Sequence, residues 1–143
     1  MDDLGEIDDD ELLYRKVSVN SGWYDPKKKE LKPDALKPKS ADVAGISFDR
    51  AQSDAHPDFR TAKEAAVGPS TGGYFIAVFR VGDLRSCGLS ITADPIEDNP
   101  GHALLTQLTY QNRKDDSSRE VMVRLAHELV VRIEGPFCLW VIS

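Results

Sequence analysis

His102 has the clearest capacity for chemistry in this chain, because it stands between a proline–glycine turn and an apolar run in "NPGHALL". A neutral imidazole can accept a proton or bind a metal ion. The acids Asp94, Glu97 and Asp98 precede it. A strand end after a turn brings only one or two of them within reach, whereas a protein metal site takes three or four ligands. We therefore predict no metal site. His102 either transfers protons or only begins a strand.

Motifs for covalent and phosphate chemistry are missing from the sequence. No serine lies in the G-x-S-x-G turn that exposes the nucleophile of many hydrolases, so no nucleophilic triad is predicted. The "GPSTGG" of residues 68–73 precedes an expected strand, whereas a phosphate-binding loop follows a strand and opens a helix. Cys87 and Cys138 have no C-x-x-C spacing, so we expect reduced, buried thiols rather than zinc or a disulfide.

Charge is divided unevenly along the chain, whose net charge is -6. Residues 1–11 carry seven acids and no base, and residues 12–39 carry eight bases against three acids. A block of like charge with few apolar residues cannot bury enough surface to offset its ordering entropy. Residues 1–10 are therefore predicted to be a disordered acidic tail, and residues 11–143 a single domain. This tail either masks the lysine-rich stretch until an acidic partner displaces it, or only adds solubility.

Composition is that of an ordinary globular domain. The 143 residues are 41% hydrophobic and 29% charged, and a chain of this length buries a core without a metal or disulfide. Its longest apolar runs, "YFIAVF" and "FCLWVI", are far shorter than the roughly 18 residues of a membrane span. Because acids, and no basic-then-apolar leader, open the sequence, we expect a cytoplasmic protein without membrane contact.

Short strands and two helices account for most of the chain. Residues 117–133 show the clearest pattern, since "SSRE" is a capping box and apolar side chains recur on one helical stripe. Prolines at 26, 33 and 38 predict a loop over residues 21–38. No βαβ repetition occurs, so the predicted fold is α+β, a single domain with one mixed or antiparallel sheet of five to six strands covered by two helices. The other expected elements are a helix at 57–67, a helical turn at 81–88, and strands at 11–17, 44–49, 74–79, 89–93, 102–110 and 135–143.

Several short blocks carry a resemblance to other proteins. "LLYRKV" (12–17), "DALKPKS" (34–40), "GISFDRA" (45–51), "DP" (94–95) and "NPGHALL" (99–105) resemble blocks found in the same order in a set of small bacterial proteins. The resemblance spans residues 12–108. It implies a bacterial origin and brings no established activity with it.

The strand with "YR", the lysine–proline loop and the "GIS" strand are also similar, more distantly, to the opening of ADP-ribosyltransferase-like domains. In such domains a basic residue on the first strand and a hydroxyl residue on a later one hold NAD. The resemblance implies these roles for Arg15 and Ser47, and an NAD- or nucleotide-dependent transferase with Arg15, Ser47 and His102 as catalytic residues and NAD as cofactor. Those domains also supply a late glutamate, for which this chain offers only Glu128 and Glu134.

The missing motifs and the segregated charge favour a different function, a small cytoplasmic bacterial protein-interaction module that needs no cofactor. It would be an accessory or immunity-type component of a defence or conflict system, with another protein as partner. Tryptophan and tyrosine are enriched at binding hot spots, and nucleic-acid binding through residues 27–39 is a second alternative because lysines and aromatic rings suit phosphates and bases. The predicted partner-binding residues, expected to be exposed, are Trp23, Tyr24, Lys27, Lys28, Lys29 and Lys32.

Overall fold

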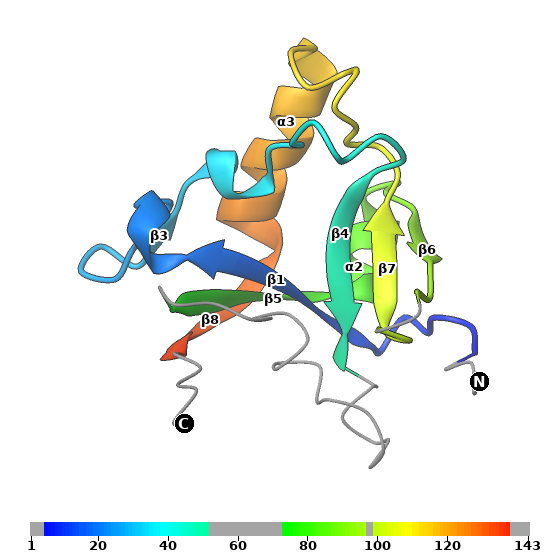
Figure 1. Ribbon diagram of the computed structural model, residues 1–143, viewed down its shortest axis with the longest axis horizontal. Helices are drawn as coiled ribbons and strands as arrows, with labels where there is room; N and C mark the ends of the chain where they lie inside the picture. Colours follow the sequence, from blue (N-terminus) through cyan, green and yellow to red (C-terminus); the bar gives the residue numbers. More distant parts are fainter. Residues whose placement is uncertain (1–4, 52–72, 97–98, 138–143) are drawn as a thin grey trace.

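A computed structural model describes residues 5–51, 73–96 and 99–137. Six strands form one antiparallel sheet in the order β6-β7-β4-β1-β5-β8, and β2 and β3 form a separate hairpin (Figure 1). The predicted α+β class and antiparallel sheet are confirmed. The strands are β1 (Leu12–Ser18), β2 (Tyr24–Asp25), β3 (Glu30–Leu31), β4 (Ile46–Arg50), β5 (Tyr74–Arg80), β6 (Ile91–Ala93), β7 (His102–Leu105) and β8 (Val130–Phe137). The helical elements are α2 (Val81–Ser86), α3 (Asp116–Arg124), the 3-10 turns η1 (Val19–Ser21) and η2 (Pro33–Leu36), and the π-helical turn η4 (Leu125–Leu129).

The sheet is divided into two halves that meet at a corner. β1 pairs with β5 along all its residues, but with β4 only through Leu13–Arg50 and Tyr14–Asp49. As a result β4 and β7 run steeply across β1 and β5 (Figure 1). Beyond the corner β1 and β4 no longer pair, and we call the line along which they diverge the seam.

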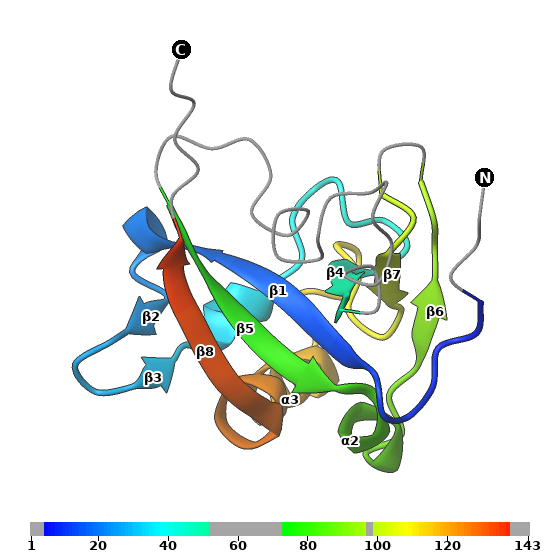
Figure 2. The ribbon, with the colours of Figure 1, turned by 90° about the horizontal axis from the view of Figure 1, so that it is seen from below.

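The main core lies on the side of the sheet that carries the helices. Figure 2 shows α2 and α3 on the same side of β1, β5 and β8. Phe48 and Phe79 pack there with ring centroids 5.6 Å apart, and Leu125 of η4 is fully buried in the same cluster. On the opposite side, which we call the outer face, Tyr14, Ile76 and Val78 form a second buried cluster. Residues 75–79 are therefore buried on both faces, as their unbroken apolar run predicted.

The predicted helix at 117–133 is wrong at both ends. It begins one residue earlier, with Asp115 at the N-cap and no side-chain cap bond, so the capping box does not form. It ends in η4, and residues 130–137 form β8, which pairs with β5. Val130, Val131 and Ile133 are β-branched. Such residues suit a strand, and β5 offers them an open row of backbone donors and acceptors.

Some of the other predicted elements agree with the structure and some do not. The strands predicted at 11–17, 44–49 and 89–93 are confirmed within a few residues, while the one at 102–110 ends at Leu105. The predicted loop at 21–38 contains β2, β3 and η2, whose Leu31 and Leu36 are buried in the core. The helix predicted at 57–67 lies outside the described residues, as does the end of the predicted terminal strand. No helix of the described residues has the length and apolar character to span a membrane.

Residues 5–11 lie against the body of the domain, although the sequence predicted a disordered tail up to residue 10. Arg50, only 1% exposed, donates to both carboxylate oxygens of Glu11 at 2.9 Å. The same guanidinium donates to the carbonyls of Gly5 at 2.8 Å and Glu6 at 3.1 Å. Ile7 is buried in the core. A buried arginine needs all these acceptors, so it orders a segment whose own composition favours disorder.

Acids of this segment also form ion pairs with arginines at the other end of the molecule from the lysine-rich stretch. Asp9 pairs with Arg85 at 2.7 Å and Asp10 with Arg80 at 3.0 Å. Both pairs are substantially exposed, and such pairs contribute about 0–1 kcal/mol each. In residues 5–11, then, acids pair with Arg80 and Arg85, whereas the charge pattern predicted that the acidic tail masks the lysine-rich stretch.

Gly45 precedes β4 at a position that a larger residue cannot occupy without strain. Its φ is +148°, and a Cβ there would meet the carbonyl oxygen of Leu105 and lie 3.1 Å from Thr106 Cα. We expect Gly45→Ala to lower the free energy of unfolding by about 1–3 kcal/mol, measured by urea denaturation. Gly22→Ala is the matched control, because Gly22 has φ +72° but open space around it. Equal losses in the two variants would show that the contact with β7 is unimportant.

Candidate functional site

Polar side chains from three neighbouring strands gather on the outer face of the sheet. Asp49 of β4 stands opposite His102 of β7, and Ser47 lies two residues before Asp49, so all three side chains share a face. Asp94 follows β6 directly and its backbone N–H donates to the His102 carbonyl at 2.8 Å. We call Ser47, Asp49, His102 and Asp94 the polar row.

His102 joins a hydroxyl to a carboxylate. Its Nε2 lies 2.9 Å from Ser47 Oγ. Its Nδ1 lies 3.1 Å from Asp94 Oδ2 and 3.0 Å from the Asp94 carbonyl oxygen. Both partners of Nδ1 can only accept, so in the neutral ring Nδ1 carries the proton. Nε2 is then left to accept the Ser47 hydroxyl proton, which is the arrangement that makes a serine nucleophilic.

The side chains of the polar row are partly exposed, and the imidazole is more enclosed than the Asp94 carboxylate. The His102 side chain is 16% exposed and that of Asp94 47%. Ser47 is half-buried. A partly dry setting strengthens the hydrogen bonds of the row relative to bulk water.

The "NPG" turn before His102 holds the ring in place. The Asn99 carbonyl accepts from the His102 backbone N–H at 3.2 Å, and the Asn99 side-chain oxygen accepts from the Gly101 N–H at 3.1 Å. The Asn99 amide donates to Asp49, and the Gly101 carbonyl accepts from the Arg50 N–H at 2.8 Å. The turn therefore connects β7 to β4 through both backbone and side chains.

Arg15 lies at the seam, directly beside Ser47. Its Nη1 donates to the Ser47 carbonyl at 2.9 Å and its Nε to the Ala35 carbonyl at 3.2 Å. Burial lowers the pKa of the Arg15 guanidinium, and the charges of Asp42 and Asp49 oppose that shift. Arginine has so high a pKa that the group stays charged at neutral pH. The guanidinium thus contacts the backbone of Ser47, whereas the Ser47 hydroxyl lies against His102.

Ser47 contacts both Arg15 and His102 through different atoms: its backbone carbonyl accepts from Arg15, and its hydroxyl lies against His102. These are the three residues that the transferase hypothesis requires in one place. The two candidate late glutamates have other partners: Glu128 pairs with Arg124 on α3 at 3.3 Å, and Glu134 pairs with Arg132 on β8 at 3.1 Å.

Asp94 is the member of the row whose role the sequence analysis missed. The sequence showed Asp94 only as one of three acids near His102. Because the G-x-S-x-G turn is missing, it also predicted no nucleophilic triad of serine, histidine and aspartate. One signal was present. The strands expected at 89–93 and from 102 onward are joined by a short turn, and pairing them as an antiparallel hairpin places residue 94 beside residue 102.

The predicted partner-binding residues divide into two groups. Lys27, Lys28, Lys29 and Lys32 are exposed as expected. Trp23 and Tyr24 are instead half-buried and pack against the main core. The Tyr24 ring meets Phe75 edge-on with centroids 4.9 Å apart, and Lys39 Nζ lies 5.9 Å from the centre of the Trp23 ring. Both aromatic rings therefore pack against core residues that the local sequence did not predict as their neighbours.

Because Trp23 packs against the core, truncating it should affect stability. We expect Trp23→Ala to lower the free energy of unfolding by about 1–3 kcal/mol, less than for a fully buried ring. Urea denaturation followed by circular dichroism measures the loss. Lys28→Ala, at an exposed position of the β2–β3 hairpin, is the control and should change nothing measurable. An unchanged midpoint for Trp23→Ala would restore its role as an exposed hot spot.

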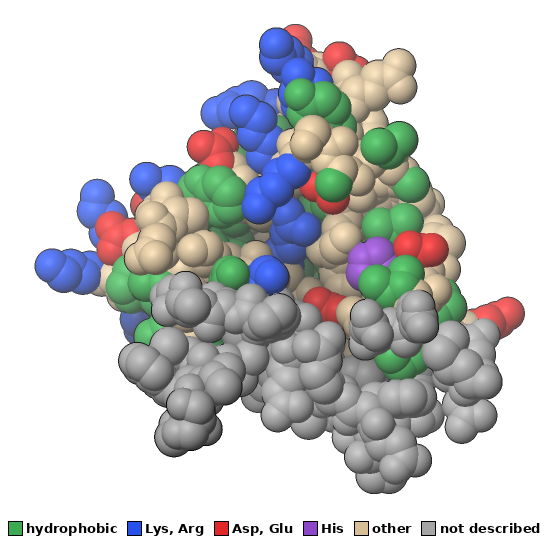
Figure 3. Space-filling view, viewed as in Figure 1, with side chains coloured by type: hydrophobic (Ala, Val, Ile, Leu, Met, Phe, Trp, Pro, Cys, Tyr) green, Lys and Arg blue, Asp and Glu red, His purple; other side chains and the backbone are tan. Residues whose placement is uncertain are grey.

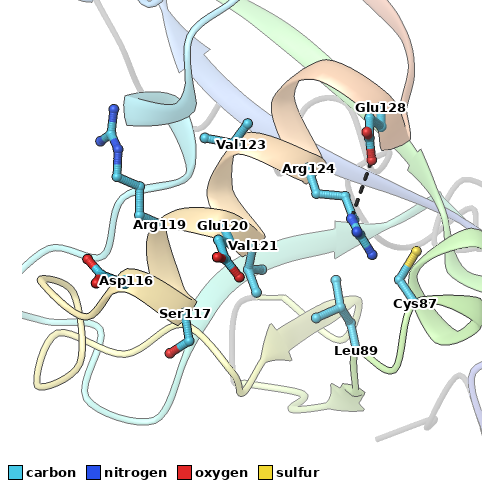
Figure 4. A pocket seen from close by; sticks show the side chains of 10 residues that line it. All are labelled: Cys87, Leu89, Asp116, Ser117, Arg119, Glu120, Val121, Val123, Arg124 and Glu128. Atoms are coloured by element: carbon cyan, nitrogen blue, oxygen red, sulfur yellow. Dashed lines mark ion pairs between the residues drawn. The ribbon is translucent and has the colours of Figure 1, made fainter.

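A groove lies on the helix side of the sheet. This groove of about 790 Å³ runs beside α3 (Figure 4), and Cys87, a free half-buried thiol, lies at one side of it. Arg124 and Glu128 form an ion pair within its lining. Its other lining residues are Leu89, Asp116, Ser117, Arg119, Glu120, Val121 and Val123. Over residues 5–51, 73–96 and 99–137, no group of three or more His, Cys, Asp or Glu side chains is arranged to hold a metal ion.

The polar row therefore has the clearest chemical capacity among the described residues. His102 can withdraw the Ser47 proton, and Asp94 can stabilise the imidazolium that forms. Comparison with protein-family models, with curated proteins and with solved structures finds no match for this chain.

Proposed function

We propose that the protein is a hydrolase or group transferase in which Ser47 is the nucleophile, His102 the general base and Asp94 the orienting carboxylate. The observation that supports this function is the continuous series from Ser47 Oγ through the imidazole to Asp94 Oδ2, with links of 2.9 and 3.1 Å. Nucleophile, base and orienting group within hydrogen-bond reach define nucleophilic catalysis on many unrelated folds.

The reaction follows from the proton positions. Ser47 Oγ attacks an electrophilic acyl or phosphoryl centre while His102 Nε2 takes the hydroxyl proton. The bond to the leaving group breaks, and the leaving group receives that proton from Nε2. Water, deprotonated by Nε2, then attacks the same centre, the bond to Ser47 Oγ breaks, and Oγ takes the proton back from Nε2 to regenerate the free serine. A transferase uses the hydroxyl of an acceptor in place of water.

Negative charge accumulates on the oxygens of the attacked centre. The Arg15 guanidinium donates to the Ser47 backbone carbonyl and not to its hydroxyl, so it attracts this charge only across β4. The NAD- or nucleotide-dependent transferase implied by the resemblance is a different mechanism, because there Arg15 and Ser47 would hold NAD and Ser47 would not be the nucleophile.

A fluorophosphonate probe tests the assignment, because it phosphonylates only activated serines. We expect labelling of Ser47, located by peptide mass spectrometry, and its loss in Ser47→Ala. Ser117→Ala is the matched control, since Ser117 is exposed and makes no cap bond, and this variant should label like the parent protein. If Ser47 reacts no faster than Ser117, the nucleophile assignment is wrong.

A protein-interaction role, as an accessory or immunity-type component in a bacterial cytoplasm, is the second candidate. The exposure of Lys27, Lys28 and Lys29 in the β2–β3 hairpin favours it. Asp25 holds this turn by accepting from the backbone N–H groups of Lys27 at 2.9 Å and Lys28 at 3.3 Å. Replacing the three lysines by glutamate should abolish retention of a co-purifying protein without changing Ser47 labelling. Unchanged retention would exclude this surface as the contact.

A further inference from the structure

β6 is the strand at one end of the sheet, and it pairs on its inner side with β7. The Ser90 carbonyl accepts from the Thr106 N–H at 3.4 Å, and the Asp94 N–H donates to the His102 carbonyl at 2.8 Å. Residues 90 and 94 therefore direct these backbone groups toward β7.

Two residues of β6 direct their backbone groups the other way. The direction of the N–H and C=O groups alternates along an antiparallel strand, so those of Ile91 and Ala93 point away from β7. Within residues 5–51, 73–96 and 99–137, no hydrogen bond uses these outward-facing groups. Such an open strand edge is a template to which another strand can be added.

The open edge of β6 borders a second groove, of about 830 Å³. This groove is lined by residues 91–93, by residues 6–10 and by Arg85. Figures 1 and 2 show the segment before β1 on the side of β6 that faces away from β7. Residues 6–10 therefore lie across the groove from the open edge.

The groove is acidic on the side formed by residues 6–10. Arg85, the one basic side chain among the described lining residues, is paired with Asp9 at 2.7 Å. Glu6 and Asp8 are exposed, and their carboxylates form no ion pair with the described part of the chain. In Figure 3, Lys and Arg side chains gather over β1 and β3, whereas Asp and Glu side chains lie beyond the histidine, toward β6. A basic ligand therefore matches the charge of this groove.

We infer that the groove binds an extended, lysine- or arginine-rich peptide segment of another protein, which adds a strand to the sheet at β6. Its backbone hydrogen-bonds to Ile91 and Ala93, which supplies affinity, and its cations lie against Glu6 and Asp8, which select for positive charge. The inference goes beyond the proposed function and does not rest on it, because β6 lies between this groove and His102 of β7.

Fluorescence anisotropy with the full-length chain tests the inference. The probe is a fluorescein-labelled peptide of about eight alternating lysine and threonine residues, within the usual length of a strand. A second peptide has the same sequence with every backbone nitrogen methylated, so it keeps the charge but cannot donate to a strand. We expect methylation to raise the Kd by about 5- to 100-fold, the effect of losing two backbone hydrogen bonds. A third peptide, with glutamate in place of lysine, should show no saturable binding.

Glu6→Lys combined with Asp8→Lys tests the contribution of charge. It should raise the Kd of the lysine peptide by about 2- to 30-fold, the contribution of two exposed ion pairs, and the effect should shrink as salt is added. Glu30→Lys combined with Asp34→Lys is the matched control, because these acids are also exposed and the change in net charge is the same. The control should bind like the parent protein.

Ala93→Pro tests the open edge from the side of the protein. The Ala93 N–H points away from β7, so proline removes an outward donor without removing a hydrogen bond to β7. We expect the Kd of the lysine peptide to rise by about 2- to 10-fold. Circular dichroism and urea denaturation check that the variant folds. If it does not, the methylated peptide and the Glu6 and Asp8 variant decide.

Three results would overturn the inference. The first is binding of the methylated peptide as tightly as the unmodified one, or equal losses in the two double variants, because net charge alone would then explain the binding. The second is the absence of saturable binding of the lysine peptide. The third is self-association of the chain that Ala93→Pro abolishes, which would make a second copy the occupant of the edge.

Discussion

His102→Ala is expected to slow fluorophosphonate labelling of Ser47 by about 10²- to 10⁴-fold, the usual contribution of a general base. The reason is that Nε2 is the acceptor for the Ser47 proton at 2.9 Å. Without the ring, the hydroxyl must lose its proton to water. The rate constant of labelling, followed by in-gel fluorescence, measures the change.

His102→Gln separates this chemical effect from a change in structure. Glutamine fills much of the same volume and can accept a hydrogen bond from Ser47, but it does not take up a proton at neutral pH. It should be as slow as His102→Ala while unfolding at the same urea concentration as the parent protein. Labelling by His102→Gln at the parental rate would remove His102 from the mechanism.

Asp94→Asn should have a smaller effect than either histidine variant. The Asp94 backbone carbonyl also accepts from Nδ1, at 3.0 Å, so the ring keeps its proton on Nδ1 when the carboxylate is lost. What disappears is the negative charge that stabilises the imidazolium. An Asp94→Asn rate below that of His102→Ala would contradict this arrangement of protons.

Glu11→Ala is expected to lower the free energy of unfolding by about 3–5 kcal/mol, the cost of removing one side chain of a buried ion pair. Arg50 and Glu11 have side chains only 1% and 8% exposed, and both carboxylate oxygens accept from the guanidinium at 2.9 Å. The same guanidinium also donates to the carbonyls of Gly5 and Glu6, which do not carry the negative charge of the carboxylate. Urea denaturation measures the loss.

Asp10→Ala is the matched control from the same segment. Its carboxylate pairs with Arg80 at 3.0 Å, but the Asp10 side chain is 94% exposed. Exposed pairs contribute about 0–1 kcal/mol, so the change should be small. If Glu11→Ala destabilises no more than Asp10→Ala, residues 5–11 are not docked as the structure shows, and the disordered tail predicted from charge is restored.

The fold class and most strands could be predicted because they depend on local patterns. The period-two alternation around Ile46 and Phe48 and the unbroken apolar run at 74–79 describe which faces of a strand are buried, whatever its neighbours. The helix predicted at 117–133 was longer than the observed one, because its last residues fit both the helical and the strand periodicity. Only the open edge of β5 decides that Val130 and Ile133 join the sheet.

The candidate site depended on information that no local pattern contains. Residues 47, 94 and 102 meet because β6, β7 and β4 lie side by side in that order. Alternation predicts that Ser47 faces away from the core, but it does not say which strand lies next to it or in which register. Strand order is settled by how the whole core packs, and a shift of one residue would turn Ser47 away from His102. Residue types therefore established the chemical capacity of each side chain, and long-range pairing alone turned a serine, a histidine and an aspartate into one site.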